Sequence, residues 1–228
     1  MKEIYLDTVD STNSEAKRRA LSGESLPMLV VSEYQTAGRG RLGRSFYSPE
    51  GTGLYMSLAY LAGDKLENAV KVTSAAAVAV CRAIEKLADV KCMIKWVNDI
   101  YVENRKVCGI LAEATRIEGK DLIVVGVGVN CTTRDFPEDI AHRAGSIGNV
   151  SKKDLARAIC ENILSLVENG GWIEEYRERS LALGREVSYG SQGNEKTSVA
   201  VAVGDSGELI LADGSVLSTG EISLKIHS

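Results

Sequence analysis

The residues best suited to chemistry lie in a loop rich in glycine and arginine, which runs from Gly38 to Arg44 with the sequence GRGRLGR. Glycines let backbone N–H groups approach an anion closely, and the guanidinium groups of Arg39, Arg41 and Arg44 match the oxygens of carboxylates and phosphates. The segment lacks the GK[ST] ending of a P-loop and is not a dinucleotide fingerprint. We expect it to hold two anions together, although a solvated basic turn or a contact with an RNA backbone would also explain the segment taken alone.

A second group of polar residues surrounds two strand ends. Lys95 and Asp99 belong to the sequence KWVND, and Lys106 begins the sequence KVCGILAE. Alternation along a strand would send Lys95 and Asp99 to one face, and Trp96 and Asn98 to the other. A lysine beside an apolar strand is commonly a rim residue, and this alternative is stronger for Lys95 than for Lys106, which enters an almost wholly apolar strand.

The remaining candidate residues lie in two segments, a glycine-containing strand that ends at Asn130 and the DSTN segment at the start of a helix. Gly126 and Gly128 would let a ligand or another backbone approach the strand that Asn130 ends, although tight packing of a long helix explains these glycines equally well. In the sequence DSTN, Thr12 is predicted to be the N-cap of a helix, with Glu15 three positions later. This structural role is complete in itself, so the spacing assigns DSTN no ligand.

These residues must be positioned by a sheet and its covering helices. Apolar and β-branched segments predict strands over residues 3–6, 28–34, 54–60, 91–102, 106–115 and 121–129. Amphipathic segments and caps predict helices over residues 12–22, 66–87, 151–168 and 172–183, with Ser151 as an N-cap and Asp154 three positions later. Together these elements predict an α+β fold with a mixed or antiparallel sheet and helices on one face.

After Gly184 the predicted elements change from helices and longer strands to short strands. Short alternating segments over residues 186–189, 198–203, 208–211, 216–217 and 221–226 are separated by glycine-rich turns. We therefore predict two domains, a larger one over residues 1–183 and a small β-barrel over residues 184–228.

Composition excludes several classes of protein. The chain has 228 residues, of which 44% are apolar, and its net charge of −4 gives no global attraction to nucleic acid. With two phenylalanines and two tryptophans, a stacking platform for single strands is not expected. No signal core or long apolar run is present, which predicts a cytoplasmic protein without a membrane contact. Five widely spaced cysteines predict reduced core thiols, and two histidines without a CxxC pair predict no metal site formed by the protein alone.

Seven motifs, taken in order, closely resemble the biotin–protein ligase family. They are DSTN (residues 10–13), EYQTAGRGRLGR (33–44), SPEG (48–51), KWVND (95–99), KVCGILAE (106–113), GVGVN (126–130) and GEISL (220–224). The resemblance covers nearly the whole chain. It implies a catalytic domain related to class II aminoacyl-tRNA synthetases, a mixed sheet flanked by helices, followed by an SH3-like barrel. Many relatives also carry an N-terminal helix-turn-helix repressor domain; because Met1 lies nine residues before DSTN, we expect a short form without it and no direct DNA binding.

The resemblance also implies which residues bind which substrate. It implies that biotin is bound by Ser11, Thr12, Asn13, Gln35, Gly38, Arg39, Gly40, Arg41 and Lys106, with the Arg39–Arg41 stretch on the reacting carboxylate. It implies that ATP is bound by Arg44, Phe46, Lys95, Asn98, Asp99 and Asn130, and that Mg²⁺ arrives with ATP. Catalytic roles are implied for Arg41, Lys106 and Asp99. The chain departs from the family pattern at Phe46, where tryptophan is usual, and at Val97, where proline is usual.

The activity implied is that of a biotin–protein ligase, which activates biotin with ATP as biotinyl-5'-AMP and releases pyrophosphate. The family then transfers biotin to a lysine of a biotin carboxyl carrier domain, and a homodimer is consistent with the resemblance. Since the substrate carboxylate is itself the nucleophile, such a site needs cations to bring two anions together and no Ser–His or Cys–His pair. The alternatives are a lipoate ligase or octanoyltransferase of the same superfamily, whose known members lack the GRGRxGR loop, and a non-catalytic biotin sensor.

Overall fold

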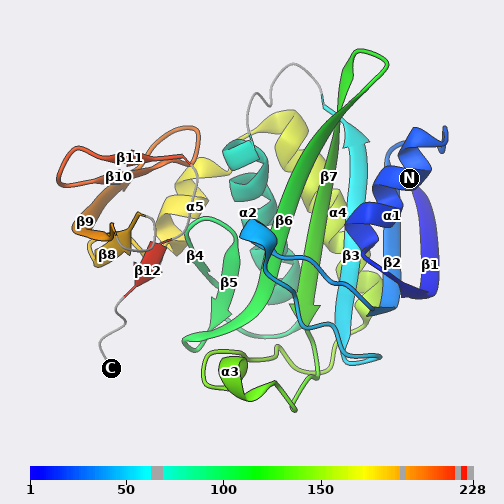
Figure 1. The fold of residues 1–228 in the computed structure, drawn as a ribbon, viewed down its shortest axis with the longest axis horizontal. Coiled ribbons are helices and arrows are strands. Elements are labelled where there is room, and N and C mark those ends of the chain that lie inside the picture. The colour runs from blue at the N-terminus through cyan, green and yellow to red at the C-terminus, as the bar shows by residue number, and fades with distance from the viewer. Residues whose placement is uncertain (63–68, 191–193, 219–221, 225–228) are drawn as a thin grey trace.

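The computed structural model describes residues 1–62, 69–190, 194–218 and 222–224. A seven-stranded sheet in the order β1-β2-β3-β7-β6-β5-β4 forms its centre (Figure 1). Its strands are β1 (Lys2–Val9), β2 (Met28–Gln35), β3 (Gly53–Leu61), β4 (Met93–Lys95), β5 (Asp99–Val102), β6 (Arg105–Ile117) and β7 (Lys120–Asn130). β1 and β2 are parallel and every other neighbouring pair is antiparallel, so the predicted mixed sheet is confirmed.

Helices cover both faces of the sheet, so the prediction of helices on one face is wrong. The long helices α2 (Ala69–Leu87) and α4 (Lys152–Asn169) lie on one side, and α1 (Thr12–Leu21) lies on the other (Figure 1). The physical reason is visible in β2, whose two faces are both apolar: Leu29 belongs to the core shared with α2 and α4, whereas Met28 packs with Ala16 of α1. A strand covered on both faces reads as a continuous apolar run, and the first four residues of β2 have this pattern.

The helix ends confirm one predicted cap and correct two boundaries. The Ser151 hydroxyl accepts from the Asp154 N–H at 3.3 Å, as the spacing predicted. The N-cap of α1 is Ser11 rather than Thr12, which is the first helical residue. The helix α5 (Ile173–Arg179) ends earlier than predicted, because the extended backbone of Ser180 begins a parallel bridge to β4. One further short helix, α3 (Glu138–Ala141), follows β7.

The segment 91–102 is not one strand, as predicted, but a hairpin of β4 and β5 with a turn over residues 96–98. The Trp96–Val97 peptide bond in this turn is cis. Val97 is buried and its carbonyl accepts from the Tyr176 hydroxyl of α5 at 3.2 Å, while Trp96 Nε1 donates to the carbonyl of Gly207 at 2.9 Å. Hydrogen bonds from α5 and to the C-terminal part of the chain therefore fix the position of this turn.

The C-terminal residues form a second, five-stranded antiparallel sheet in the order β11-β10-β9-β8-β12, which is consistent with an SH3-like domain. Its strands are β8 (Glu186–Tyr189), β9 (Lys196–Val203), β10 (Leu209–Leu211), β11 (Val216–Leu217) and β12 (Ile222–Leu224). The predicted fold class is confirmed. Parts of three predictions, namely residues 66–68 of a helix, the first two residues of GEISL and the two ends of the last strand, lie outside the described residues.

All five cysteines are buried and free, as expected for reduced core thiols. Within the described ranges, no helix combines the length and the apolar character that a membrane span requires.

Candidate active site

A cavity of about 260 Å³ lies on the α1 side of the sheet, between the start of α1 and the glycine–arginine loop that joins β2 to β3. Residues of β7 form the floor of the cavity, and the alternation of side chains between the two faces of the strand explains which ones. Leu122 and Val124 point toward α1 and fill the space beneath it, whereas Gly126 and Gly128, on the same face, leave the space beyond the helix open. The short helix of the loop, η1 (Arg41–Gly43), lies above this floor.

The two floor glycines are required because polar and aromatic side chains pack directly on the strand. A Cβ atom at Gly126 would lie 2.1 Å from Asn13 Oδ1, and one at Gly128 would lie 2.4 Å from the ring of Phe46. The alternative explanation, packing against the long helix, is wrong, since α2 covers the opposite face. The absence of a side chain at Gly126 and Gly128 therefore makes room for the Asn13 amide and the Phe46 ring, respectively.

One wall of the cavity is a network of neutral hydrogen-bonding groups. The backbone N–H and the hydroxyl of Thr12 donate to Gln35 Oε1 at 2.9 and 3.1 Å. The hydroxyl of Ser57, a fully buried residue of β3, lies 2.6 Å from Asn13 Oδ1 and 2.8 Å from Thr12 Oγ1. We call Thr12, Asn13, Gln35 and Ser57 the amide wall. It carries no net charge and suits a neutral polar ligand.

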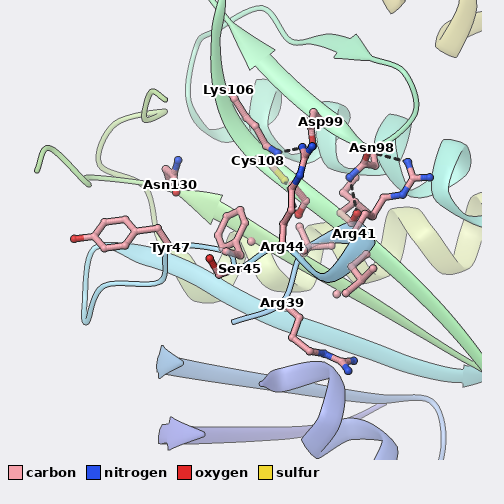
Figure 2. A pocket seen from close by; sticks show the side chains of 18 of the residues that line it. Arg39, Arg41, Arg44, Ser45, Tyr47, Asn98, Asp99, Lys106, Cys108 and Asn130 are labelled. Carbon is pink, nitrogen blue, oxygen red and sulfur yellow. Dashed lines mark hydrogen bonds and ion pairs between the residues drawn. The ribbon is translucent and has the colours of Figure 1, made fainter. Parts of the chain in front are cut away.

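The facing wall is cationic. Arg41 Nη1 donates to Asn98 Oδ1 at 3.1 Å, and Lys106 Nζ lies 2.7 Å from Asp99 Oδ1. The Lys106–Asp99 contact is a close ion pair whose geometry is not that of a hydrogen bond, so Asp99 Oδ1 keeps no aligned donor in the structure. Figure 2 shows Arg44 pointing toward Asp99 and Lys106. We call Arg41, Arg44, Lys95 and Lys106 the cationic wall, and all four line the cavity.

Lys106 reaches this wall through an irregularity of the sheet. Asp99 pairs with Gly109 and Ile100 with Cys108, but Tyr101 pairs with Lys106 because one extra residue is inserted in β6. Without this bulge, Lys106 would point to the face opposite to Gly109. The bulge thus brings Lys106 to the same face as Asp99. The Lys95–Asp99 pair across β4 and β5 adds a second lysine to that row.

The predicted site residues converge on this cavity with one exception. The lining residues include Ser11, Thr12, Asn13, Gln35, Arg39, Gly40, Arg41, Arg44, Phe46, Lys95, Asn98, Asp99, Lys106 and Asn130. Gly38 is not among them; a Cβ atom there would lie 2.6 Å from the Phe46 carbonyl oxygen, so Gly38 serves the internal packing of the loop. The predicted alternation is right for Lys95 and Asp99, which pair on one face, and wrong for Asn98, which lies in the hairpin turn and lines the same cavity.

Arg39 does not join the other arginines of the loop. Figure 2 shows it pointing away from Arg41 and Arg44. Its Nη2 lies 2.5 Å from Glu113 Oε2, and its side chain is 46% exposed. The expectation that Arg39 and Arg41 act together on one carboxylate therefore does not match this arrangement.

Several cavity residues were not singled out from the sequence. They include Ser45, Tyr47, Tyr101, Cys108, Phe136, Ile140, Arg143 and Ala144, together with Ser57 of the amide wall and Glu113 behind that wall. Ser57 could have been noticed as the single serine within a strand that is otherwise aliphatic and aromatic. Burial, and to a lesser extent the negative charge of Asp99, raises the pKa of Tyr101 to about 12, against the opposing charge of Arg143, so this phenol is neutral near pH 7. Burial also raises the pKa of the Cys108 thiol, which is therefore no nucleophile.

Comparison with known proteins identifies relatives of this arrangement. Residues 5–130 match the model of the biotin/lipoate A/B protein ligase family. The chain is 36% identical over 169 residues to the bifunctional ligase/repressor BirA of Bacillus spizizenii, covering 72% of this chain and 52% of that protein. It is 31% identical to a biotin–[acetyl-CoA-carboxylase] ligase of Mycobacterium tuberculosis, covering 93% and 85% of the two chains. The chain thus spans about half the length of the BirA proteins of Bacillus that it matches.

Solved structures give the same result for the fold. A biotin protein ligase from Aquifex aeolicus, solved in complex with biotin and ATP, superimposes with a TM-score of 0.81 at 29% identity and covers 98% of each chain. A biotin protein ligase from Leishmania major, solved in complex with biotin, has a TM-score of 0.68 at 25% identity, with 95% of this chain and 97% of that chain covered.

Proposed function

Because this chain belongs to the biotin/lipoate A/B protein ligase family, we propose that it is a biotin–protein ligase that uses ATP. The observation that carries the proposal is one cavity with two unlike walls. The amide wall offers neutral donors and acceptors, which suit the ureido ring of biotin, and the cationic wall offers charge to a carboxylate and a phosphate. Biotin would lie with its ring at Thr12, Asn13 and Gln35 and its carboxylate toward Arg41.

The first half-reaction joins two anions. A carboxylate oxygen of biotin attacks the α-phosphorus of ATP, a C–O–P bond forms, and the bond to the β-phosphate breaks, so that biotinyl-5'-AMP and pyrophosphate are produced. Arg41, Arg44, Lys95 and Lys106 offset the repulsion between the reactants and stabilise the charge that develops on the phosphoryl oxygens. Asn98 and Asn130 would bind the nucleotide, with Phe46 as an aromatic surface over Gly128.

The donor set fits a magnesium ion that is held mainly by the nucleotide. Among the described residues no group of three or more His, Cys, Asp or Glu side chains could hold a metal ion. The cavity lining includes the Asp99 carboxylate and the amide side chains of Asn98 and Asn130, whose oxygens are hard donors of the kind that Mg²⁺ accepts in addition to phosphate oxygens. When bound, Mg²⁺ would add positive charge to the phosphates, and the chain itself would contribute Asp99.

The second half-reaction transfers biotin to a protein lysine. The neutral ε-amine attacks the acyl carbon of biotinyl-5'-AMP, the new amide bond forms, and AMP leaves. A free lysine has a pKa of about 10.4, so a group of the site must accept its proton. Asp99 is our candidate for this role, with Lys106 as the alternative, and a biotin carboxyl carrier domain is the proposed acceptor.

Pyrophosphate exchange tests the proposal directly. Purified protein is incubated with ATP, labelled pyrophosphate and either biotin or lipoate, and label entering ATP is counted. We expect exchange with biotin only, followed by addition of one biotin to a carrier domain in a mass spectrum. Exchange with lipoate only would replace biotin by lipoate as the substrate. Biotin binding without exchange would show a sensor rather than an enzyme.

A further inference from the structure

Glu113 lies behind the amide wall and is outside the set of residues assigned above to either substrate. It is on β6, on the same face as the floor of the cavity, because it pairs with Val124 two residues before Gly126. Its Oε2 atom lies within hydrogen-bonding distance of two donors, 2.7 Å from Asn13 Nδ2 and 2.5 Å from Arg39 Nη2. One carboxylate therefore joins the start of α1 to the start of the glycine–arginine loop.

The contact with Asn13 sets the direction of hydrogen bonds along the amide wall. With Nδ2 held by Glu113 and by the carbonyl of Leu111 at 3.2 Å, Asn13 must turn Oδ1 toward Ser57. A serine hydroxyl has a single proton, and the 2.6 Å contact with Oδ1 uses it. The Thr12 hydroxyl also has a single proton, which it can donate to Ser57 at 2.8 Å or to Gln35 at 3.1 Å, and in either case its oxygen keeps a lone pair that can accept from a ligand N–H. Replacing Glu113 would remove the acceptor that fixes the orientation of the Asn13 amide, so the directions of the other hydrogen bonds in the amide wall would no longer be set.

The contact with Arg39 separates the arginines of the loop. Arg39 is paired with a carboxylate, so it does not compete with Arg41 for a ligand anion, and Arg41 remains oriented by Asn98. The loop is also closed at this point, because Arg39 bridges to Ser45 and the Gly40 N–H donates to the Arg44 carbonyl at 2.7 Å. An anchor at Arg39 therefore positions the whole turn that carries Arg41.

We propose that Glu113 is a positioning residue for the biotin half of the site. It fixes Asn13 so that the amide wall presents an ordered set of donors and acceptors, and it holds Arg39 so that Arg41 alone meets the carboxylate. This inference rests on the proposed function for the identity of the ligand. Its contribution to the loop does not depend on any ligand.

The variants Glu113→Gln and Glu113→Ala test the proposal, with Glu33→Gln as the matched control. Glu33 forms an equally short ion pair at a similar exposure, but its partner Lys152 does not line the cavity, whereas the partners of Glu113, Asn13 and Arg39, both do. We expect Glu113→Gln to raise the Kd for biotin, measured without ATP, by about tenfold, corresponding to the loss of one charge-assisted hydrogen bond. The KM for ATP should stay within about twofold, and the control should match the wild type.

A ligand-free readout separates this inference from the proposed function. Trypsin cleavage after Arg39 should be several-fold faster in both Glu113 variants, because the arginine side chain loses its partner, and unchanged in the control. Unchanged biotin affinity together with unchanged cleavage would overturn the inference, as would equal losses for biotin and ATP with a lower Tm. A wild type that binds no biotin would overturn the proposed function, and the role of Glu113 would then be decided by cleavage alone.

Discussion

Two glycines on one strand allow the two halves of the cavity to be perturbed separately. Replacing Gly126 by alanine places a Cβ atom 2.1 Å from Asn13 Oδ1, whereas real Cβ contacts essentially never fall under 3.0 Å. Asn13 must therefore withdraw by about 0.9 Å. It is 4% exposed, and such a shift would stretch its 2.6 Å contact with Ser57 to the limit of a hydrogen bond. The expected loss of stability is about 1–3 kcal/mol.

Gly128→Ala is the matched variant two residues away. Its Cβ atom would lie 2.4 Å from the Phe46 ring, which is a half-buried loop side chain and can rotate. The expected loss of stability is under about 1 kcal/mol, because no buried hydrogen bond is broken. Neither glycine has a positive φ, so backbone strain does not contribute to either result.

The two variants should differ in the ligand that they affect. We expect Gly126→Ala to raise the Kd for biotin by about tenfold or more, and Gly128→Ala to raise the KM for ATP with little effect on biotin. Calorimetric titration measures the first quantity, pyrophosphate exchange the second, and urea unfolding the stability. Equal effects of both variants on both ligands, or a greater loss of stability in Gly128→Ala, would refute the assignment of Asn13 and Phe46 to opposite halves.

Three further predictions concern stability and reactivity. Trp96→Phe leaves the buried Gly207 carbonyl without its donor and should cost about 1–3 kcal/mol in urea unfolding; an unchanged midpoint would remove that hydrogen bond from the account. Hydrogen bonds from Arg18 lower the pKa of Asp10 to about 2, so its stabilising effect should be complete above about pH 4 and lost as the pH falls through about 2; the Tm difference between wild type and Asp10→Asn should shrink over this window. Burial raises the pKa of Cys160 to about 12, so at pH 8 a thiol reagent should label it only after denaturant is added, and rapid labelling of the folded protein would contradict the structure.

The sequence by itself determined the local features of this protein. Period-2 and apolar segments located the strands of both sheets, except that the hairpin of β4 and β5 was predicted as one strand. The Ser151 cap was correct because a cap depends on neighbouring residues, and the cap of α1 was misplaced by one residue, from Ser11 to Thr12. The loop around Arg41 was recognisable from its composition as a candidate anion site, and that role is still a prediction. The boundary near residue 184 is still a prediction.

Register and pairing were decided only by the tertiary structure. A single inserted residue in β6 turns Lys106 toward Asp99, and no local pattern reveals a bulge. Arg39 contacts Glu113 rather than the ligands of Arg41, and Glu113 is 74 residues away from Arg39 in the sequence. Periodicity reports which face of a segment is buried, whereas a binding cavity is formed by the distances between segments, and those follow from how the strands pair and the helices pack.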